Sequence, residues 1–257
     1  MEILQTVNLK KYFGETHAVD DVSLTIQEGE FVSLVGPNGA GKTSLINVVS
    51  AYLRPDSGKV IFRGQDVTHA SVTERVKAGI ARSFQLVNLF DDLSAFDNIA
   101  LAIFSREGKT LNLAKLAHLD DEVSAETDSV LGQFNLLSKR NERARDLAQG
   151  ERKLLDVAIA YALKPKLLFL DEPTSGVSTR DKDQIMDTIA SVVRRERITA
   201  VIVEHDMDVV FKYSDRIVVM HQGAILAQGV PDDIRNNDQV AMILLGTSGP
   251  DAFTRKD

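Results

Sequence analysis

The stretch of sequence that decides the fold is EFVSLVGPNGAGKTSLINVVS, residues 30–50. Residues 30–35 are almost continuously apolar, which predicts a strand buried on both faces. Residues 44–50 have the apolar spacing of a helix. The loop between them satisfies the phosphate-binding pattern of a glycine, four variable residues and Gly-Lys followed by Ser or Thr. A strand, this loop and a helix in that order predict an α/β fold with a site for nucleotide phosphates.

The loop suits phosphates for two physical reasons. Its glycines allow backbone N–H groups to close around a phosphate, and the helix N-terminus contributes partial positive charge. We expect Lys42 to reach the β- and γ-phosphates and Thr43 to ligate Mg²⁺. The alternative is a glycine-rich turn with an exposed lysine. The expected nucleotide contacts of this loop are Gly36, Pro37, Asn38, Gly39, Ala40, Gly41, Lys42, Thr43 and Ser44.

A second motif is the apolar run LLFL, residues 167–170, which is followed by Asp171 and Glu172. Carboxylates at the C-terminal end of a buried strand lie at the edge of the sheet where ligands bind. Asp171 suits a Walker B role, in which it holds Mg²⁺ through water. Glu172 suits a general base that orients and deprotonates a water molecule. Taken alone, such a pair has the alternative of a helix cap or a solvated turn.

Composition narrows the class of protein. The chain has 257 residues, 44% of them hydrophobic, and a net charge of −7. These values indicate a folded protein and argue against nucleic-acid binding through overall charge. The absence of cysteine excludes disulfides and thiolate chemistry. Because no apolar run approaches the roughly 18 residues of a membrane span, and the first residues do not resemble a signal peptide, we expect cytoplasmic residence.

Strand and helix patterns organise the rest of the chain. An N-terminal, partly antiparallel layer is expected from strands at 2–9, 19–26 and 59–62. A mostly parallel sheet is expected from buried strands at 30–35, 167–170, 199–204 and 216–220. Residues 93–145 are predicted to form an inserted helical subdomain, in which Ser94 and Asp97 form an N-cap pair. We therefore predict a single domain over 1–257, with a catalytic core at 1–92 and 146–246 and a flexible tail at 247–257.

Four further motifs carry a resemblance to the ATP-binding cassette (ABC) family. The run Leu147–Glu151, LAQGE, opens a helix and resembles the LSGGQ signature of that family. Gln85 matches its Q-loop, and His205 matches its switch histidine. Phe13 matches the position whose ring stacks on adenine, with Tyr12 as the alternative. The resemblance covers nearly the whole chain.

This resemblance implies a role for each matching residue. Gln149 and Gly150 would contact the nucleotide held by a second subunit, and Phe13 would contact adenine. Outside the ordered series of motifs, a lone histidine or glutamine is an ordinary surface or core residue. The implied catalytic residues are Lys42, Gln85, Glu172 and His205. The implied metal ligands are Thr43, Gln85 and Asp171.

Two positions depart from the family pattern. Ala148 stands where most signatures have a serine whose hydroxyl contacts the γ-phosphate across the dimer, and losing that hydrogen bond is expected to cost about 1–3 kcal/mol. Ser178 stands where the D-loop usually has an aspartate. Gly150 and the helix N-terminus are retained, so the anion-binding part of the signature is intact. Importers of the branched-chain amino acid type show comparable variants at both places.

The sequence is most similar to the ATPase subunits of branched-chain amino acid importers, on the motifs EHDM at 204–207 and SDRIVVMHQG at 214–223. The implied function is ATP hydrolysis with Mg²⁺, coupled to import of a solute. The implied partners are a second ABC ATPase, identical or different, in a head-to-tail dimer, then transmembrane permease subunits and, indirectly, a solute-binding protein. The implied location is the inner face of the cell membrane.

Three alternatives remain open at this point. ATPases for amide, urea or lipopolysaccharide transport look similar. A regulatory cassette that binds ATP and hydrolyses little of it is suggested by Ala148 and Ser178, but Glu172 and His205 argue against it. Soluble cassettes that act on ribosomes or DNA usually carry two cassettes or a long coiled coil, and neither is visible here. We therefore expect no nucleic-acid partner.

Overall fold

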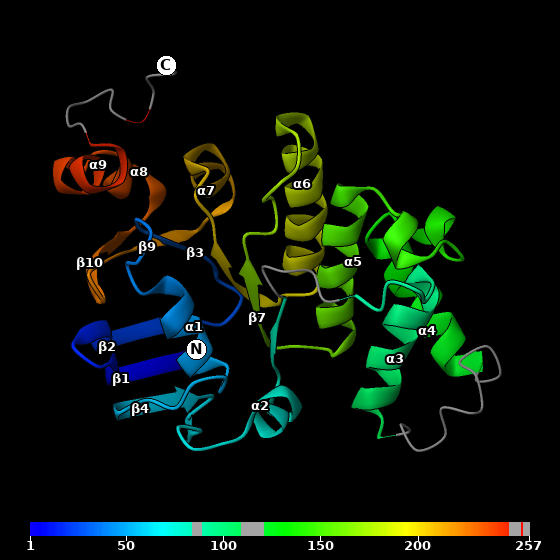
Figure 1. The fold of residues 1–257 in the computed structure, drawn as a ribbon, viewed down its shortest axis with the longest axis horizontal. Helices are drawn as coiled ribbons and strands as arrows, with labels where there is room; N and C mark the ends of the chain where they lie inside the picture. Colours follow the sequence, from blue (N-terminus) through cyan, green and yellow to red (C-terminus); the bar gives the residue numbers. More distant parts are fainter. Residues whose placement is uncertain (84–88, 109–120, 247–252, 254–257) are drawn as a thin grey trace. The chain divides into compact units, whose positions relative to one another are not determined.

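The computed structural model describes residues 1–83, 89–108, 121–246 and 253. The chain divides into two compact units, one formed by Met1–Arg75 with Thr199–Asp257 and the other by Val76–Ile198. Figure 1 shows the helices and strands of each unit. Both units combine helices with parallel strands, so the predicted α/β fold is confirmed.

The first unit contains an antiparallel sheet in the order β2-β1-β4-β5. Its strands are β1 Glu2–Phe13, β2 Thr16–Gln27, β4 Ser57–Phe62 and β5 Gln65–Asp66. The first two extend beyond the predicted ends because a tight hairpin joins them. Phe13 pairs with Thr16, and Gly14 turns the chain at a φ of 60°, a left-handed conformation that suits glycine. The predicted antiparallel layer is therefore confirmed.

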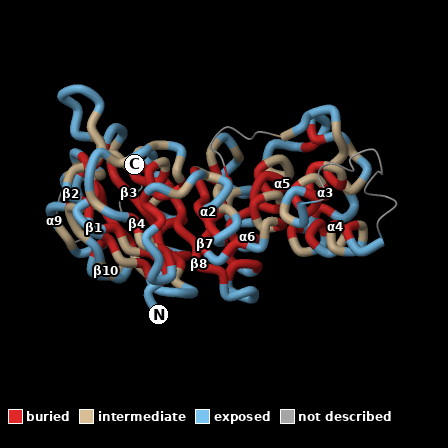
Figure 2. Tube along the Cα trace, turned by 90° about the horizontal axis from the view of Figure 1, so that it is seen from below, coloured by how far each residue is buried: buried red, intermediate tan, exposed pale blue. Residues whose placement is uncertain are grey.

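A second group of strands in this unit has the order β10-β9-β3-β8. The strands are β3 Phe31–Val35, β8 Thr199–Val203, β9 Arg216–His221 and β10 Ala224–Gly229. β3 is parallel to both β8 and β9, whereas β10 is antiparallel to β9. Every residue of β3 and β8 is buried, as the red tube in Figure 2 shows. This burial explains their continuously apolar sequences.

Several helices belong to the first unit, and the last three of them along the chain share a small core with this group of strands. These helices are α1 Lys42–Val49, α7 Met207–Tyr213, α8 Pro231–Arg235 and α9 Asp238–Leu245. A further helix, α2 Val72–Ala78, contains the point in the sequence where the first unit ends and the second begins. The core includes Val35, Val210, Ile217, Val219, Ile234 and Val240. Phe253 packs against it, with its ring centroid 5.2 Å from that of Phe211.

The second unit contains β6 Ile80–Arg82 and β7 Leu167–Asp171, which are parallel to each other. Its helices are α3 Ala95–Arg106, α4 Asp121–Gln133, α5 Gln149–Ala162 and α6 Thr179–Arg195, with short 3₁₀ turns at Leu137–Lys139 and Ala144–Asp146. The predicted N-cap pair is confirmed, because the Ser94 hydroxyl accepts a hydrogen bond from the Asp97 N–H at 3.0 Å. The division into core, helical subdomain and tail stays a prediction.

Candidate functional site

The predicted phosphate loop joins β3 to α1 in the first unit. The helix begins at Lys42, two residues before the predicted start, because Gly41 occupies the N-cap position in a left-handed conformation with a φ of 100°. A Cβ atom at this position would overlap the carbonyl oxygen of Ala18. Glycine at the N-cap also means that no side chain caps the helix. The N-cap residue thus supplies no side-chain acceptor to the first-turn N–H groups of α1, which are the groups that bind anions at helix N-termini.

Lys42 lies over this loop. Its ammonium donates hydrogen bonds to the carbonyl oxygens of Gly36 at 2.7 Å and Pro37 at 3.1 Å. The residue is only 6% exposed, whereas Asn38 and Thr43 are exposed. The alternative of an exposed lysine on a glycine-rich turn is therefore wrong. The segment 36–44 therefore contains the ammonium of Lys42, the hydroxyl of Thr43 and the backbone amides of the loop.

The structure separates the two aromatic candidates for adenine stacking. Tyr12 donates a hydrogen bond to Asp20 Oδ1 at 2.6 Å, and its ring stacks on that of His17 with 4.1 Å between centroids. The bond to Asp20 raises the pKa of Tyr12 to about 12. Phe13 is 50% exposed, with the ammonium of Lys11 5.5 Å from its ring centroid. Of the two rings, Phe13 is the one that projects to the surface.

His205 lies just after β8 in the first unit and is exposed. Its backbone N–H donates to the carboxylate of the preceding Glu204 at 3.2 Å. The next residue, Asp206, caps α7 by accepting a hydrogen bond from the Asp208 N–H at 3.1 Å. The imidazole therefore stands on a short, anchored connection between a buried strand and a helix.

Asp171, the last residue of β7, lies in the second unit and is 2% exposed. Arg82 Nη2 at the end of β6 donates to Asp171 Oδ2 at 2.7 Å, and the arginine is 8% exposed. The pairing engages one of the two carboxylate oxygens. Parallel pairing of Arg82 with Phe169 sets this arrangement. Asp171 is thus a buried, charge-paired carboxylate, and not a solvated turn residue.

Glu172 follows directly and is partly exposed. Its backbone has a φ of 50°, in the left-handed region that non-glycine residues rarely adopt. The Ser175 N–H donates to the Glu172 carbonyl oxygen at 3.1 Å and closes a turn over 172–175. Uncommon backbone conformations of this kind cluster at functional sites, because the surrounding structure must hold them.

The predicted signature opens α5, in the second unit. Ala148 is the N-cap residue, and its N–H donates to Glu151 Oε2 at 2.8 Å, but its methyl group cannot accept a bond in return. A Cβ atom on Gly150 would lie 3.3 Å from Ile185 Cδ1 of α6, so packing alone already favours a small residue there. A Cβ atom on Gly176 would lie 3.6 Å from Gln149 Nε2.

Ser178 has a structural role of its own. It is the N-cap residue of α6, and its hydroxyl accepts a hydrogen bond from the Asp181 N–H at 3.3 Å. The same hydroxyl donates to Asp181 Oδ2 at 2.7 Å. Serine and aspartate are both strong N-cap residues. The departure from the family pattern at this position therefore preserves the start of the helix.

The predicted site residues fall into two sets. Phe13, the loop 36–44 and His205 belong to the first unit, and Asp171, Glu172, Gln149 and Gly150 belong to the second. Gln85 lies outside the described residues. Two buried cations were not predicted: Arg82, which pairs with Asp171, and Lys153, which donates to the 172–175 turn. A charged residue within an otherwise apolar strand or helix face is the only signal that the sequence offers for them.

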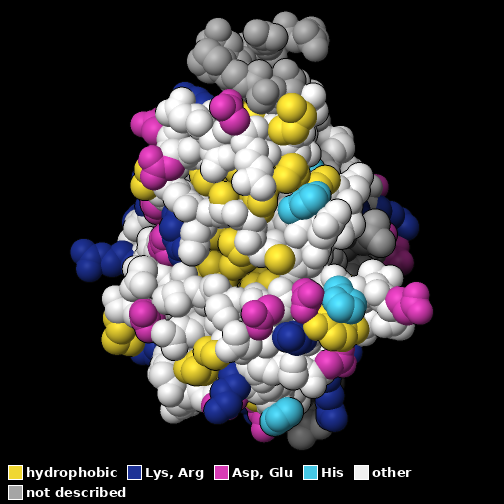
Figure 3. Space-filling model, turned by 90° about the vertical axis from the view of Figure 1, so that its left-hand side faces the viewer, with side chains coloured by type: hydrophobic (Ala, Val, Ile, Leu, Met, Phe, Trp, Pro, Cys, Tyr) yellow, Lys and Arg dark blue, Asp and Glu magenta, His cyan; other side chains and the backbone are white. Residues whose placement is uncertain are grey.

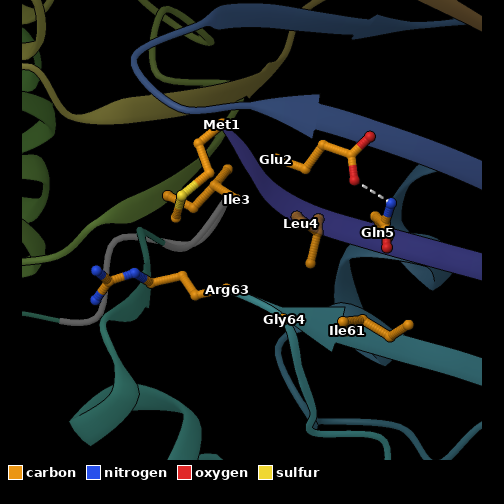
Figure 4. Close-up of a pocket in the computed structure, with 8 residues that line it drawn as sticks. All are labelled: Met1, Glu2, Ile3, Leu4, Gln5, Ile61, Arg63 and Gly64. Carbon is orange, nitrogen blue, oxygen red and sulfur yellow. Dashed lines mark hydrogen bonds between the residues drawn. The ribbon is translucent and has the colours of Figure 1, made fainter.

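Other features of the described parts of the chain add no second site. A pocket of about 260 Å³ is lined by residues 1–5, 61, 63 and 64, as Figure 4 shows, and contains none of the motif residues. Among the described residues, no three His, Cys, Asp or Glu side chains are placed to hold a metal ion together. In the same residues, no helix has the length and apolar character to span a membrane. On the face drawn in Figure 3, basic side chains lie scattered among acidic ones.

Comparison with known proteins gives a consistent result. The family model described as "ABC transporter" matches residues 19–175. The probable branched-chain amino acid transport ATP-binding protein LivG of Archaeoglobus fulgidus is 34% identical over 96% of both chains. The high-affinity branched-chain amino acid transport ATP-binding protein BraF of Pseudomonas aeruginosa is 33% identical over 95% of this chain and 98% of its own.

A solved structure shows the same likeness in three dimensions. The ADP conformation of an ATP-binding cassette of an ABC transporter has a TM-score of 0.85 and 30% sequence identity. The match covers 96% of this chain and 99% of that one. A nucleotide-free cassette from an ABC transporter gives a TM-score of 0.83 at 30% identity. The similarity therefore extends over nearly the full length of each chain.

Proposed function

The chain belongs to the ATP-binding cassette family, and we propose that it is the ATP-hydrolysing subunit of an importer for branched-chain amino acids. Membership in this family accounts for the binding and hydrolysis of ATP. The observation that carries the choice of solute is the full-length similarity to LivG and BraF, at 33–34% identity over at least 95% of each chain. The test must distinguish this function from the alternatives, which are ATPases of amide, urea or lipopolysaccharide transporters.

In this proposal the first unit binds the nucleotide. Phe13, exposed beside the hairpin, stacks on adenine, and the backbone amides of the loop 36–44 contact the phosphates. Lys42 is supported as a phosphate ligand because its ammonium already lies against the loop carbonyls. On binding, the ammonium exchanges these neutral acceptors for charged phosphate oxygens, which form stronger hydrogen bonds.

Thr43, Gln85 and Asp171 are the residues that we propose as holders of Mg²⁺. Hydroxyl, amide and carboxylate oxygens are the hard ligands that Mg²⁺ prefers. Arg82 engages one oxygen of Asp171, which is compatible with a water-mediated contact through the other. When bound, Mg²⁺ neutralises charge on the β- and γ-phosphates.

Hydrolysis in this proposal is the work of Glu172 and His205. Glu172 accepts a proton from the attacking water and aligns it with the γ-phosphate, because this reaction depends mainly on positioning and charge neutralisation. His205 contributes a hydrogen-bonding group near the transferred phosphoryl, and Gln85 orients the water. Glu172 is partly exposed and His205 is exposed, which supports access of both side chains to a substrate.

The complete enzyme in this proposal is a head-to-tail dimer with an identical or a different ABC ATPase. The N-terminus of α5, at Gln149 and Gly150, faces the ATP bound to the partner. ATP binding closes the dimer, and hydrolysis reopens it. The motion passes to transmembrane permease subunits. Contact with these subunits places the protein on the inner face of the cell membrane. A solute-binding protein delivers the solute from the other side.

The test of the proposed solute reconstitutes this chain with the permease subunits and the solute-binding protein that the proposal assigns to it. We expect leucine, isoleucine or valine, added with the binding protein, to raise the ATPase rate of the complex in proteoliposomes. Urea, short amides and lipopolysaccharide should leave the rate unchanged. Stimulation by urea or an amide, without stimulation by leucine, would replace the proposed solute by one of the alternatives.

Ala148 is one of the two residues that suggest the regulatory alternative, a cassette with little hydrolysis, and its role can be tested by substitution. We expect Ala148→Ser to tighten the ATP-dependent dimer by about 1 kcal/mol, or about fivefold, because it restores a hydroxyl that faces the partner's γ-phosphate. Sedimentation with ATP in the Glu172→Gln background would measure the dimer dissociation constant. A serine at this N-cap would also stabilise α5 within the monomer, so a control is needed.

Val230→Ser is the matched control for this substitution. Val230 is likewise an N-cap residue without a side-chain cap, at the start of α8, and it is not among the residues proposed to contact a nucleotide. It should raise the urea midpoint of the monomer without changing the dimer constant. If Ala148→Ser leaves the dimer constant unchanged as well, Ala148 does not face a nucleotide, and the assignment of the signature must be redrawn.

A further inference from the structure

The turn that carries Glu172 is held by a residue that no motif includes. Lys153 lies on α5, three residues after Gly150, and is 4% exposed. Its ammonium donates to the Glu172 carbonyl oxygen at 3.2 Å and to Ser175 Oγ at 3.0 Å. These two acceptors stand at the two ends of the turn 172–175. One buried cation therefore clamps the turn from the side of the signature helix.

The need for such a clamp follows from the backbone of Glu172. Its φ of 50° is sterically unfavourable for a residue with a Cβ atom, so surrounding contacts must hold it. The bond from the Ser175 N–H to the Glu172 oxygen, at 3.1 Å, closes the turn but leaves α5 unconnected to it. Lysine is almost never buried unless its charge has partners, and the turn 172–175 supplies two acceptors for this ammonium.

We propose that Lys153 is a positioning residue that keeps Glu172 in the conformation required of the base and links it to the signature helix. This inference rests on the proposed roles of Glu172 and of the α5 N-terminus. Because Lys153 lies on the first turns of α5, a shift of that helix on contact with the partner's ATP moves the ammonium and, with it, the backbone of Glu172. Occupancy of one nucleotide site thereby influences hydrolysis at the other.

The test compares Lys153→Met with the unaltered protein. Methionine is unbranched and of similar length, so it fills the buried space without supplying a donor. We expect kcat of ATP hydrolysis to fall at least about tenfold, less than the roughly 10²–10⁴ expected when the general base itself is lost, while the Kd for a fluorescent ATP analogue stays within twofold. The ATP concentration dependence of the rate should also lose its cooperativity.

An epistasis measurement separates positioning from a merely structural role. If Lys153 acts through Glu172, Lys153→Met should not lower the residual turnover of Glu172→Gln any further. A structural defect would lower turnover in both backgrounds. Ser175→Ala removes one of the two acceptors, should give a smaller loss of kcat, and serves as the second test if Lys153→Met does not fold.

Lys164→Met is the matched control, because Lys164 lies just beyond the C-terminal end of α5 and pairs with Glu126 at 2.9 Å near the surface. It should retain full activity. A normal kcat for Lys153→Met and Ser175→Ala, in a protein where Glu172→Gln is impaired, would overturn the positioning role alone. A normal kcat for Glu172→Gln would overturn the proposed base itself.

Discussion

Replacing Glu172 with glutamine should lower the turnover of ATP hydrolysis by about 10²–10⁴, the range expected when a general base is lost. The amide has nearly the shape of the carboxylate but cannot accept the proton from the attacking water. ATP binding should be retained, because the residues proposed to contact the nucleotide are unchanged. Since closure without hydrolysis cannot be reversed quickly, the variant should accumulate as an ATP-bound dimer. Phosphate release and gel filtration with ATP measure the two effects.

Glu196→Gln provides the matched control for this prediction. Glu196 is an exposed carboxylate at the C-terminal end of α6, in the same unit as Glu172. The same change of charge there should leave both turnover and oligomeric state as they are. If Glu172→Gln remains monomeric with ATP and turns over near the normal rate, another residue must serve as the base.

Replacing Lys42 with alanine should abolish productive ATP binding. The ammonium is the only side-chain cation that the loop pattern supplies to the β- and γ-phosphates. Loss of one or two charge-assisted hydrogen bonds, each worth about 1.5–3 kcal/mol, corresponds to a Kd raised by between about tenfold and about 10⁴-fold. Titration with a fluorescent ATP analogue measures the change. An affinity within twofold of the normal value would remove the assignment of the phosphate loop.

Two further measurements make the Lys42 result specific. Lys59→Ala removes an exposed lysine of the same unit and should not change ATP affinity. Because Lys42 also donates to the carbonyl oxygens of Gly36 and Pro37, circular dichroism and the urea midpoint must show that the variant remains folded. A folded Lys42→Ala protein that no longer binds ATP then identifies the ammonium as a phosphate ligand.

Much of the fold was predictable because burial leaves a direct trace in local sequence. β3, β7 and β8 are buried along their whole length, and a strand covered on both faces must be apolar throughout. β10 was missed because its residues are only partly buried and lack that pattern. The start of α1 was placed two residues late, because a left-handed glycine at the N-cap has no helical periodicity to detect.

The phosphate loop, the Asp-Glu pair and the signature could be found from the sequence because each is a contiguous run whose spacing meets a local chemical requirement. For the ring that stacks on adenine, the sequence alone offers two neighbouring candidates, Phe13 and Tyr12. They are aromatic neighbours in sequence, and the structure shows that Tyr12 stacks on His17 and bonds to Asp20, whereas Phe13 is 50% exposed.

The sequence by itself determined the α/β class, the order of the motifs and the family, since these depend on local patterns and on similarity along the chain. Only the tertiary structure decided that Asp171 is paired with Arg82, 89 residues away, and that Lys153 clamps the turn of Glu172 from 19 residues away. The physical reason is that burial of a charge depends on which chain segments pack around it. Side chains distant in sequence meet only after β6 pairs with β7 and α5 packs against β7.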